Sequence, residues 1–234
     1  MFDEKRSIPL DTNDRSCYLW FMAQATASTR ERILEQGLAL MSQAGLAGVT
    51  LGVLADQVGM SKSGLFAHFK SKEEVQIELL EHTAEFATAR VVAPAMQAEE
   101  GLPRLQALVA NWLGWTRRAG LPGGCPVAAG FFEFDDIASP VRDKILEMES
   151  EWRGLLTGLV QQAVERGHLR GDLDIAQFIW ELSGIYLSHH VAYRFLRSPD
   201  ADKRARTAFG ALLARAARAP GGKKIKRKTT RRAK

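Results

Sequence analysis

Four residues that favour helix N-termini lie close together in the first third of the chain. Ser28 or Thr29 precedes apolar residues at helical spacing, and Thr50, Ser61 and Ser71 each precede another such segment. Ser and Thr cap a helix because the side-chain oxygen accepts a backbone N–H that has no partner inside the helix. The spacing predicts helices that begin near residues 29, 51, 62 and 72, the second and third of them short.

The remainder of the chain keeps a helical period and lacks the apolar–polar alternation of a strand. Gly45 is expected to end the first helix in a left-handed conformation, and Pro94 to kink or end the fourth. Further helices are expected at about 103–118, 126–134, 141–166 and 201–217, and one more is expected to open at Asp172 or Asp174 and to run to about 196. The sequence therefore predicts an all-α fold of about nine helices.

The charge of the chain is unevenly distributed. Ten of the 32 Lys and Arg residues lie within 215–234, which contains no acid, so the rest of the chain is acidic. Cys17 and Cys125 are far apart, which excludes a disulfide framework, and no apolar run reaches the length of a membrane span. Residues 1–21 do not resemble a secretory signal, and Met22 is a candidate for the native start. These features indicate a cytoplasmic protein with no membrane partner.

The two short helices around Gly59 form a predicted helix-turn-helix. Gly59 supplies the positive φ of the turn, and the small Ala55 lets the helices cross closely. The second helix then presents its N-terminus, whose free N–H groups suit phosphates or base edges. The sequence predicts that this end contacts nucleic acid.

The residues of this motif resemble the TetR family of bacterial transcriptional regulators. The resemblance covers 29–80 and rests on Gly48-Val-Thr50, Ala55, Gly59-Met-Ser-Lys and Leu65-Phe-Ala-His-Phe-Lys-Ser-Lys-Glu73. It implies a dimer of all-helical protomers, each with an N-terminal three-helix DNA-binding domain and a C-terminal domain for ligand binding and dimerisation. Phe66 departs from the family's usual tyrosine, which contacts a phosphate, and Gly52 replaces a residue that is commonly polar.

With this resemblance, the chain divides into four expected regions: a flexible extension (1–21), a helix-turn-helix DNA-binding domain (22–72), a helical effector-binding and dimerisation domain (73–218) and a basic disordered tail (219–234). The predicted DNA-contacting residues lie at the start of the second short helix and just after it. The alternative for the lysines is a solvated surface, and for the two phenylalanines it is packing in the core or an interface. The candidates are Thr50, Ser61, Lys62, Ser63, Gly64, Phe66, His68, Phe69, Lys70 and Lys72.

The C-terminal helices are rich in large aromatic residues, most of which are expected to form ordinary core. Because the family binds its effector among these helices, some of them are candidates to line a pocket for an apolar or aromatic ligand. His82 could be a core histidine or a polar anchor for that ligand. The ligand-binding candidates are His82, Phe86, Trp112, Phe131, Phe134, Trp152 and Tyr186.

No metal site or cofactor is expected. His189 and His190 are adjacent, so they point about 100° apart on a helix and suit a shared metal poorly. Cys125 precedes Pro126 at an expected helix N-terminus, where a thiol pKa can fall. It could be a redox sensor, but a small buried residue is the simpler interpretation.

The segment from 175 to 196 is apolar nearly all round, which exceeds what one core-facing stripe needs. Together with 201–217 it suits a four-helix dimer interface. The predicted interface residues are Phe178, Trp180, Gly184, Leu187, Val191, Phe209 and Leu212.

The sequence thus predicts a dimeric, sequence-specific DNA-binding regulator, a repressor released by a small apolar or aromatic effector. Its expected partners are operator DNA, that effector and a second copy of the chain. The alternative is a non-specific nucleic-acid-binding protein driven by the basic tail. No nucleophile elbow, phosphate loop or paired carboxylates indicate an enzyme.

Overall fold

The computed structural model describes residues 28–217, which are helical nearly throughout and contain no strand. The all-α expectation is confirmed, whereas the expectations for 1–21 and 219–234 lie outside the described residues. In chain order the elements are α2 (Thr29–Gly48), α3 (Leu51–Val58), α4 (Lys62–Phe66), α5 (Lys72–Ala87), the π-helical segment η1 (Thr88–Val92), α6 (Ala93–Met96), α7 (Leu102–Trp112), α8 (Trp115–Arg118), α9 (Pro126–Glu133), α10 (Pro140–Glu165), α11 (Ile175–Arg194) and α12 (Ala201–Ala216).

The expected helix starts are present with their capping hydrogen bonds. Ser28 Oγ accepts the Glu31 N–H at 3.2 Å while the Glu31 carboxylate accepts the Ser28 N–H, which makes a capping box. Ser71 caps α5, and Asp174 rather than Asp172 caps α11. These caps satisfy backbone donors that the first turn of each helix would otherwise leave unpaired.

Two expectations about helix boundaries are wrong. The helix expected over 103–118 is divided, because Leu113 is extended and Gly114 adopts φ 70°, a left-handed conformation that favours glycine. The second is the alternative that Pro94 ends the fourth helix: the helical run continues from α5 through η1 into α6, and Pro94 lies in the first turn of α6, directly after the π-helical segment. The π-helical segment η1 carries the chain into this turn, so the described helices outnumber the nine expected.

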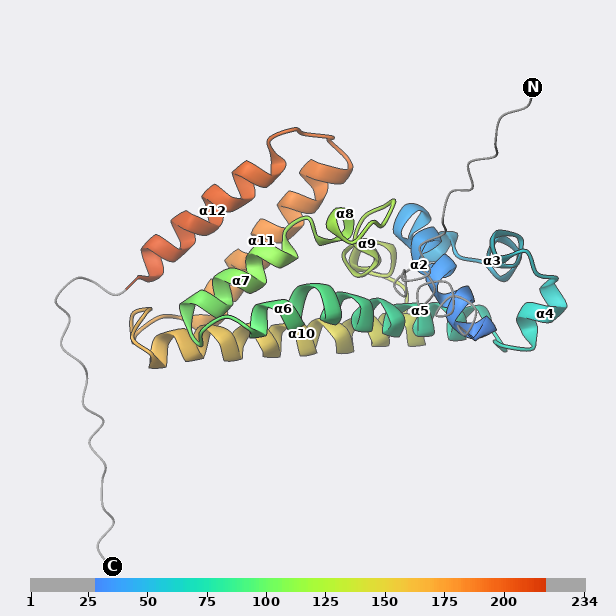
Figure 1. The fold of residues 1–234 in the computed structure, drawn as a ribbon, viewed down its shortest axis with the longest axis horizontal. Helices are drawn as coiled ribbons and strands as arrows, with labels where there is room; N and C mark the ends of the chain where they lie inside the picture. The colour runs from blue at the N-terminus through green and yellow to red at the C-terminus, as the bar shows by residue number, and fades with distance from the viewer. Residues whose placement is uncertain (1–27, 218–234) are drawn as a thin grey trace, which may run out of the picture.

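The helices form an elongated molecule with two apolar cores (Figure 1). The α5–η1–α6 run and α10 lie side by side along its length, with α3 and α4 at one end and α12 at the other. One core joins α2–α5 to Phe134, Val141 and Ile145. The other lies among η1, α6 and α7–α12 and includes Leu108, Leu156 and further residues. The N-terminal helices are therefore packed directly onto α9 and α10.

Candidate functional site

The N-terminus of α4 lies at the surface of one end of the molecule (Figure 1). Ser61 Oγ accepts the Gly64 N–H at 3.1 Å and lies 3.1 Å from Ser63 Oγ. Lys62 is exposed, and its side chain passes over Gly52, where an added Cβ would lie 3.2 Å from Lys62 Cε. Gly52 therefore leaves room for the lysine stem, which gives this departure from the family pattern a physical reason.

The two phenylalanines of the motif have different environments. Phe66 is 51% exposed, so its ring can meet a partner. Phe69 is fully buried in the N-terminal core, with the Arg30 guanidinium 4.8 Å above its ring. The assignment of Phe69 to DNA contact is therefore wrong, because its ring is enclosed by the protein. Gly64 is half-buried and its amide already bonds Ser61, so its N–H is not free for a phosphate.

The other candidates of this region remain at or near the surface. Thr50 caps α3 through a 3.2 Å bond from the Val53 N–H. Lys70 is exposed, and Lys72 Nζ donates to the Ala47 carbonyl at 3.4 Å. His68 is half-buried against Phe69. Apart from Phe69 and Gly64, the predicted DNA-contacting residues are thus exposed or half-buried, and all of them lie between residues 50 and 72.

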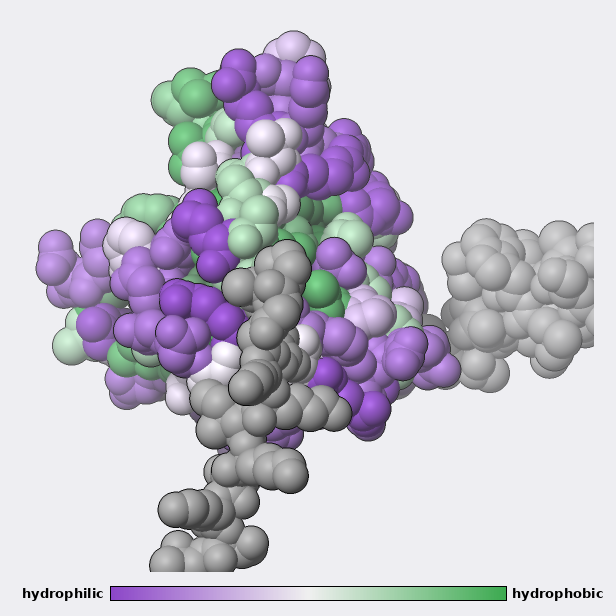
Figure 2. All heavy atoms as spheres, turned by 90° about the vertical axis from the view of Figure 1, so that its left-hand side faces the viewer, coloured by the Kyte–Doolittle hydropathy of each residue, from purple (hydrophilic) through white to green (hydrophobic). Residues whose placement is uncertain are grey.

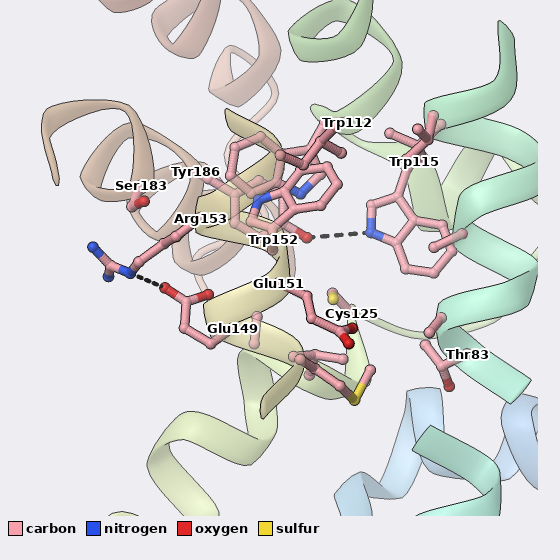
Figure 3. A pocket seen from close by; sticks show the side chains of 18 of the residues that line it. Thr83, Trp112, Trp115, Cys125, Glu149, Glu151, Trp152, Arg153, Ser183 and Tyr186 are labelled. Carbon is pink, nitrogen blue, oxygen red and sulfur yellow. Dashed lines mark hydrogen bonds and ion pairs between the residues drawn. The ribbon is translucent and has the colours of Figure 1, made fainter. Parts of the chain in front are cut away.

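A cavity of about 490 Å³ opens among α5, η1, α7, α9, α10 and α11 (Figure 3). Four of the seven predicted ligand-binding residues line it: Trp112, Phe131, Trp152 and Tyr186. Sequence reasoning did not select several other lining residues, among them Trp115, Cys125, Met148 and Leu187. Met148 stands one helical turn before Trp152 on α10, a spacing that could have indicated it.

Three predicted ligand-binding residues do not line this cavity. Phe134 is buried in the N-terminal core instead. Phe86 lies against Trp115, and the Arg90 guanidinium is 3.5 Å from the centroid of its ring. The Phe86 ring is therefore in contact with these two side chains. His82 is half-buried and its Nε2 has no hydrogen-bond partner, but the adjacent Thr83 faces the cavity in its place. These three residues lie outside the cavity lining, because helical spacing does not fix which face of a helix reaches the cavity, and their part in ligand binding stays a prediction.

The aromatic lining forms one connected group. Trp112 stacks on Tyr186 with centroids 4.0 Å apart, and Trp152 tilts against Trp112 at 4.8 Å. Trp115 Nε1 donates to the Tyr186 hydroxyl at 3.2 Å. Burial raises the pKa of Tyr186 well above its ordinary value, and the neighbouring Cys125 acts in the same direction. The hydroxyl therefore stays protonated at neutral pH and remains a hydrogen-bond donor beside the cavity.

The polar groups of the cavity lie on α10, α5 and α11. Glu149 pairs with Arg153 at 2.7 Å, and Figure 3 shows the Glu151 carboxylate close to Cys125 in the view. Trp152 Nε1 is buried and has no hydrogen-bond partner. An apolar molecule with one acceptor group would suit such a lining, because aromatic rings supply contact area and an unused donor fixes orientation.

The two histidines of α11 have different environments. His189 is buried and its Nε2 lies 2.8 Å from Asp202, which also binds Arg117. His190 packs next to Gly124, and burial lowers its pKa, with Arg194 acting in the same direction. Within 28–217, no three His, Cys, Asp or Glu side chains gather closely enough to hold a metal ion.

The outward face of α11 exposes apolar side chains. Trp180 is 67% exposed, and Gly184 and Val191 follow on the same face. Figure 2 views the α12 end and shows apolar surface at its top, at the height of the α11–α12 turn, where Phe195 and Leu196 are exposed. Sequence reasoning did not select these last two residues.

The other predicted interface residues face inward. Phe178, Phe209 and Leu212 are buried in the C-terminal core, and Leu187 lines the cavity. Phe178, Phe209 and Leu212 are covered within one protomer and present no free surface to a partner, whereas Leu187 is half-buried and its assignment stays a prediction. No helix of the described part is long and apolar enough to cross a membrane.

In comparisons with known proteins, the N-terminal and C-terminal parts of the chain each match a model of the same family. Residues 33–79 match the family model of bacterial regulatory proteins of the tetR family, and 101–209 match the tetracyclin repressor-like C-terminal domain. The nucleoid occlusion factor SlmA of Cronobacter sakazakii is 29% identical over 187 residues, 78% of this chain and 92% of that protein.

Two further relatives agree with this. The transcriptional repressor KstR2 of Mycobacterium tuberculosis is 29% identical over 150 residues, 63% of this chain and 72% of that protein. The crystal structure of a TetR regulator from Chloroflexus aurantiacus superposes with a TM-score of 0.74 at 25% identity, covering 81% of this chain and 96% of that one. The helix-turn-helix geometry, the helical C-terminal part and both family matches lead to one conclusion: the chain belongs to the TetR family of DNA-binding transcriptional regulators.

Proposed function

We propose that the protein is a dimeric, site-specific DNA-binding repressor that a small apolar or aromatic molecule releases from its operator. The observation that carries this proposal is the aromatic cavity of about 490 Å³ whose wall includes the helix run leading from the DNA-binding helices. In a dimer, two α4 helices would read successive major grooves about 34–36 Å apart. A ligand that favours another spacing lowers DNA affinity through its differential binding to the two states.

The basic segment 219–234 supports the alternative of non-specific binding, but it lies outside the described residues. Non-specific binding through such a segment would depend steeply on salt and would not select a sequence. The family assignment favours the helix-turn-helix as the reader of DNA and leaves the basic segment an auxiliary role at most.

Replacing Lys62 by alanine is expected to weaken operator binding by about 1–3 kcal/mol, or roughly 5- to 150-fold, since one charged contact at the DNA surface is lost. The operator is first obtained by selection of the full-length protein on random duplex DNA. Affinity is then measured by fluorescence anisotropy at fixed salt. The matched control is Lys203→Ala, an equally exposed lysine on α12. Equal affinities for the two variants would contradict the assignment of α4 as the reader.

Filling part of the cavity is expected to weaken ligand binding. Ser183 is half-buried and lines the cavity from α11, so Ser183→Trp would occupy part of its volume. The neutral apolar dye N-phenyl-1-naphthylamine should bind the native protein and bind this variant at least about tenfold more weakly, a loss of about 1.4 kcal/mol. Gln161→Trp, on the exposed side of α10, serves as the control. Unchanged dye binding by Ser183→Trp would mean that the cavity is not the site.

A further inference from the structure

Helix α9 touches the cavity and the DNA-binding helices at once. Val127, Ala128 and Phe131 of α9 line the cavity, together with Cys125 just before it. The same helix lies against α2 (Figure 1), with Gly130 packed so closely that an added Cβ would lie 3.0 Å from Leu46 Cδ1. A change in the cavity wall therefore has a direct path to α2 that does not pass along α5.

The start of α9 is joined to α2 through the backbone. The Gly124 N–H donates to the Ser42 carbonyl at 2.8 Å, and both residues are buried. At Gly123 an added Cβ would lie only 1.8 Å from the Ser42 carbonyl oxygen, so this approach requires glycine. The loop that leads into the cavity lining is thus fixed to the last full turn of α2.

The end of α9 is joined to α2 through Glu133. Its carboxylate accepts the Ala47 N–H at 2.7 Å and lies against Gly45, where an added Cβ would lie 2.1 Å from Oε1. Gly45 has φ 73° and ψ 175°, which interrupts α2. The amides that follow this break have no helical acceptors. The break removed an acceptor from the turn of residues 46–48. Glu133, on another helix, supplies an acceptor in its place.

This terminal turn sets the position of the DNA-binding helices. Gln76 of α5 donates to the Leu46 carbonyl at 2.6 Å, which holds the turn from its other side. The turn runs through the fully buried Val49 into Thr50, the cap of α3. A shift of the turn therefore carries α3, and with it α4, relative to the C-terminal core.

We propose that Glu133 is a positioning residue that couples the cavity to the DNA-binding helices through α9 and the terminal turn of α2. The inference rests on the proposed function for its biological meaning, but the coupling itself needs neither DNA nor ligand to be detected. A carboxylate accepting a backbone N–H makes a strong, short hydrogen bond, and coupling between sites in proteins typically amounts to about 5- to 150-fold.

Hydrogen exchange of the full-length protein tests this coupling. In Glu133→Ala, amides of residues 46–50 should exchange at least about tenfold faster, while those of α7 keep their native rates. Glu165→Ala removes an exposed carboxylate elsewhere on the surface and should change neither region. If Glu133→Ala speeds exchange throughout the chain, Glu133→Gln decides, since it keeps an acceptor oxygen and loses the charge. Native rates at 46–50 in both variants would overturn the proposal.

A double-mutant cycle then tests the link to the cavity. Phe131→Ala truncates a side chain of α9 that lines the cavity and also packs on the N-terminal core, so it should speed exchange at 46–50 more in the native background than in the Glu133→Ala background. Leu187→Ala truncates a lining side chain on α11 and should leave 46–50 unchanged in either background. Equal effects of Phe131→Ala in the two backgrounds would overturn the coupling. Failure to select an operator would count against the proposed function alone.

Discussion

Replacing Phe69 by alanine is expected to lower the free energy of unfolding by about 3–5 kcal/mol, because the ring is fully buried and its removal leaves a cavity in the N-terminal core. The loss also removes the surface on which the Arg30 guanidinium rests. DNA binding should fail in this variant through unfolding of the helix-turn-helix, not through a lost contact. Urea unfolding followed by far-ultraviolet circular dichroism measures the change.

Phe66→Ala is the matched control, since the same side chain is removed three residues away where it is 51% exposed. This variant should unfold within about 0.5–1 kcal/mol of the native protein, as surface substitutions usually do. A stability loss for Phe66→Ala as large as that for Phe69→Ala would show that the two environments are wrongly distinguished. Any effect of Phe66→Ala on operator affinity then reports on DNA contact alone.

The helix starts could be predicted from the sequence because a cap is a local interaction. Thr50 and Ser61 each bond an amide three residues later, and the glycine turn at Gly59 follows from one backbone conformation. The family pattern around these residues is equally local, so the sequence was enough to indicate the helix-turn-helix. Long-range packing contributes little to where these helices begin.

The break at Gly114 could not be predicted, because tertiary contacts stabilise it. Turning the chain there directs Trp115 to the Tyr186 hydroxyl, 71 residues further along the chain. The carbonyls that the break leaves without helical donors are taken up by Arg118, which donates to Leu113 at 2.6 Å and to Ala110 at 3.1 Å. A sequence window that contains only 103–118 does not hold the partner that makes the break favourable.

The choice of helix face also exceeded what periodicity could decide. Phe131 and Phe134 lie at the end of one short helix and both contact the N-terminal core, yet only Phe131 also lines the cavity. On α11, Phe178 is buried while Trp180, two residues later, is exposed. When a helix is apolar all round, its period cannot say which stripe meets the same protomer and which is left for a partner.

Replacing Trp180 by glutamate is expected to weaken self-association by about 2–4 kcal/mol, or roughly 30- to 1,000-fold in the dimer dissociation constant. Trp180 is the largest side chain on the outward face of α11 and is 67% exposed in one protomer. In a two-fold symmetric interface one substitution acts twice, so each dimer would lose two tryptophan contacts and gain two buried carboxylates. Sedimentation equilibrium at micromolar concentration measures the change.

The control for this variant is Phe132→Glu, which places the same charge at a 62% exposed aromatic position on α9. It should leave the dissociation constant unchanged, because α9 is not part of the proposed interface. The consequence for DNA separates dimerisation from reading: a monomer retains its α4 but loses the second half-site, so Trp180→Glu should bind a full palindrome no better than a single half-site. If Trp180→Glu dimerises with native affinity, the interface does not involve the outward face of α11. A different surface would then have to hold the two α4 helices at the spacing of successive major grooves.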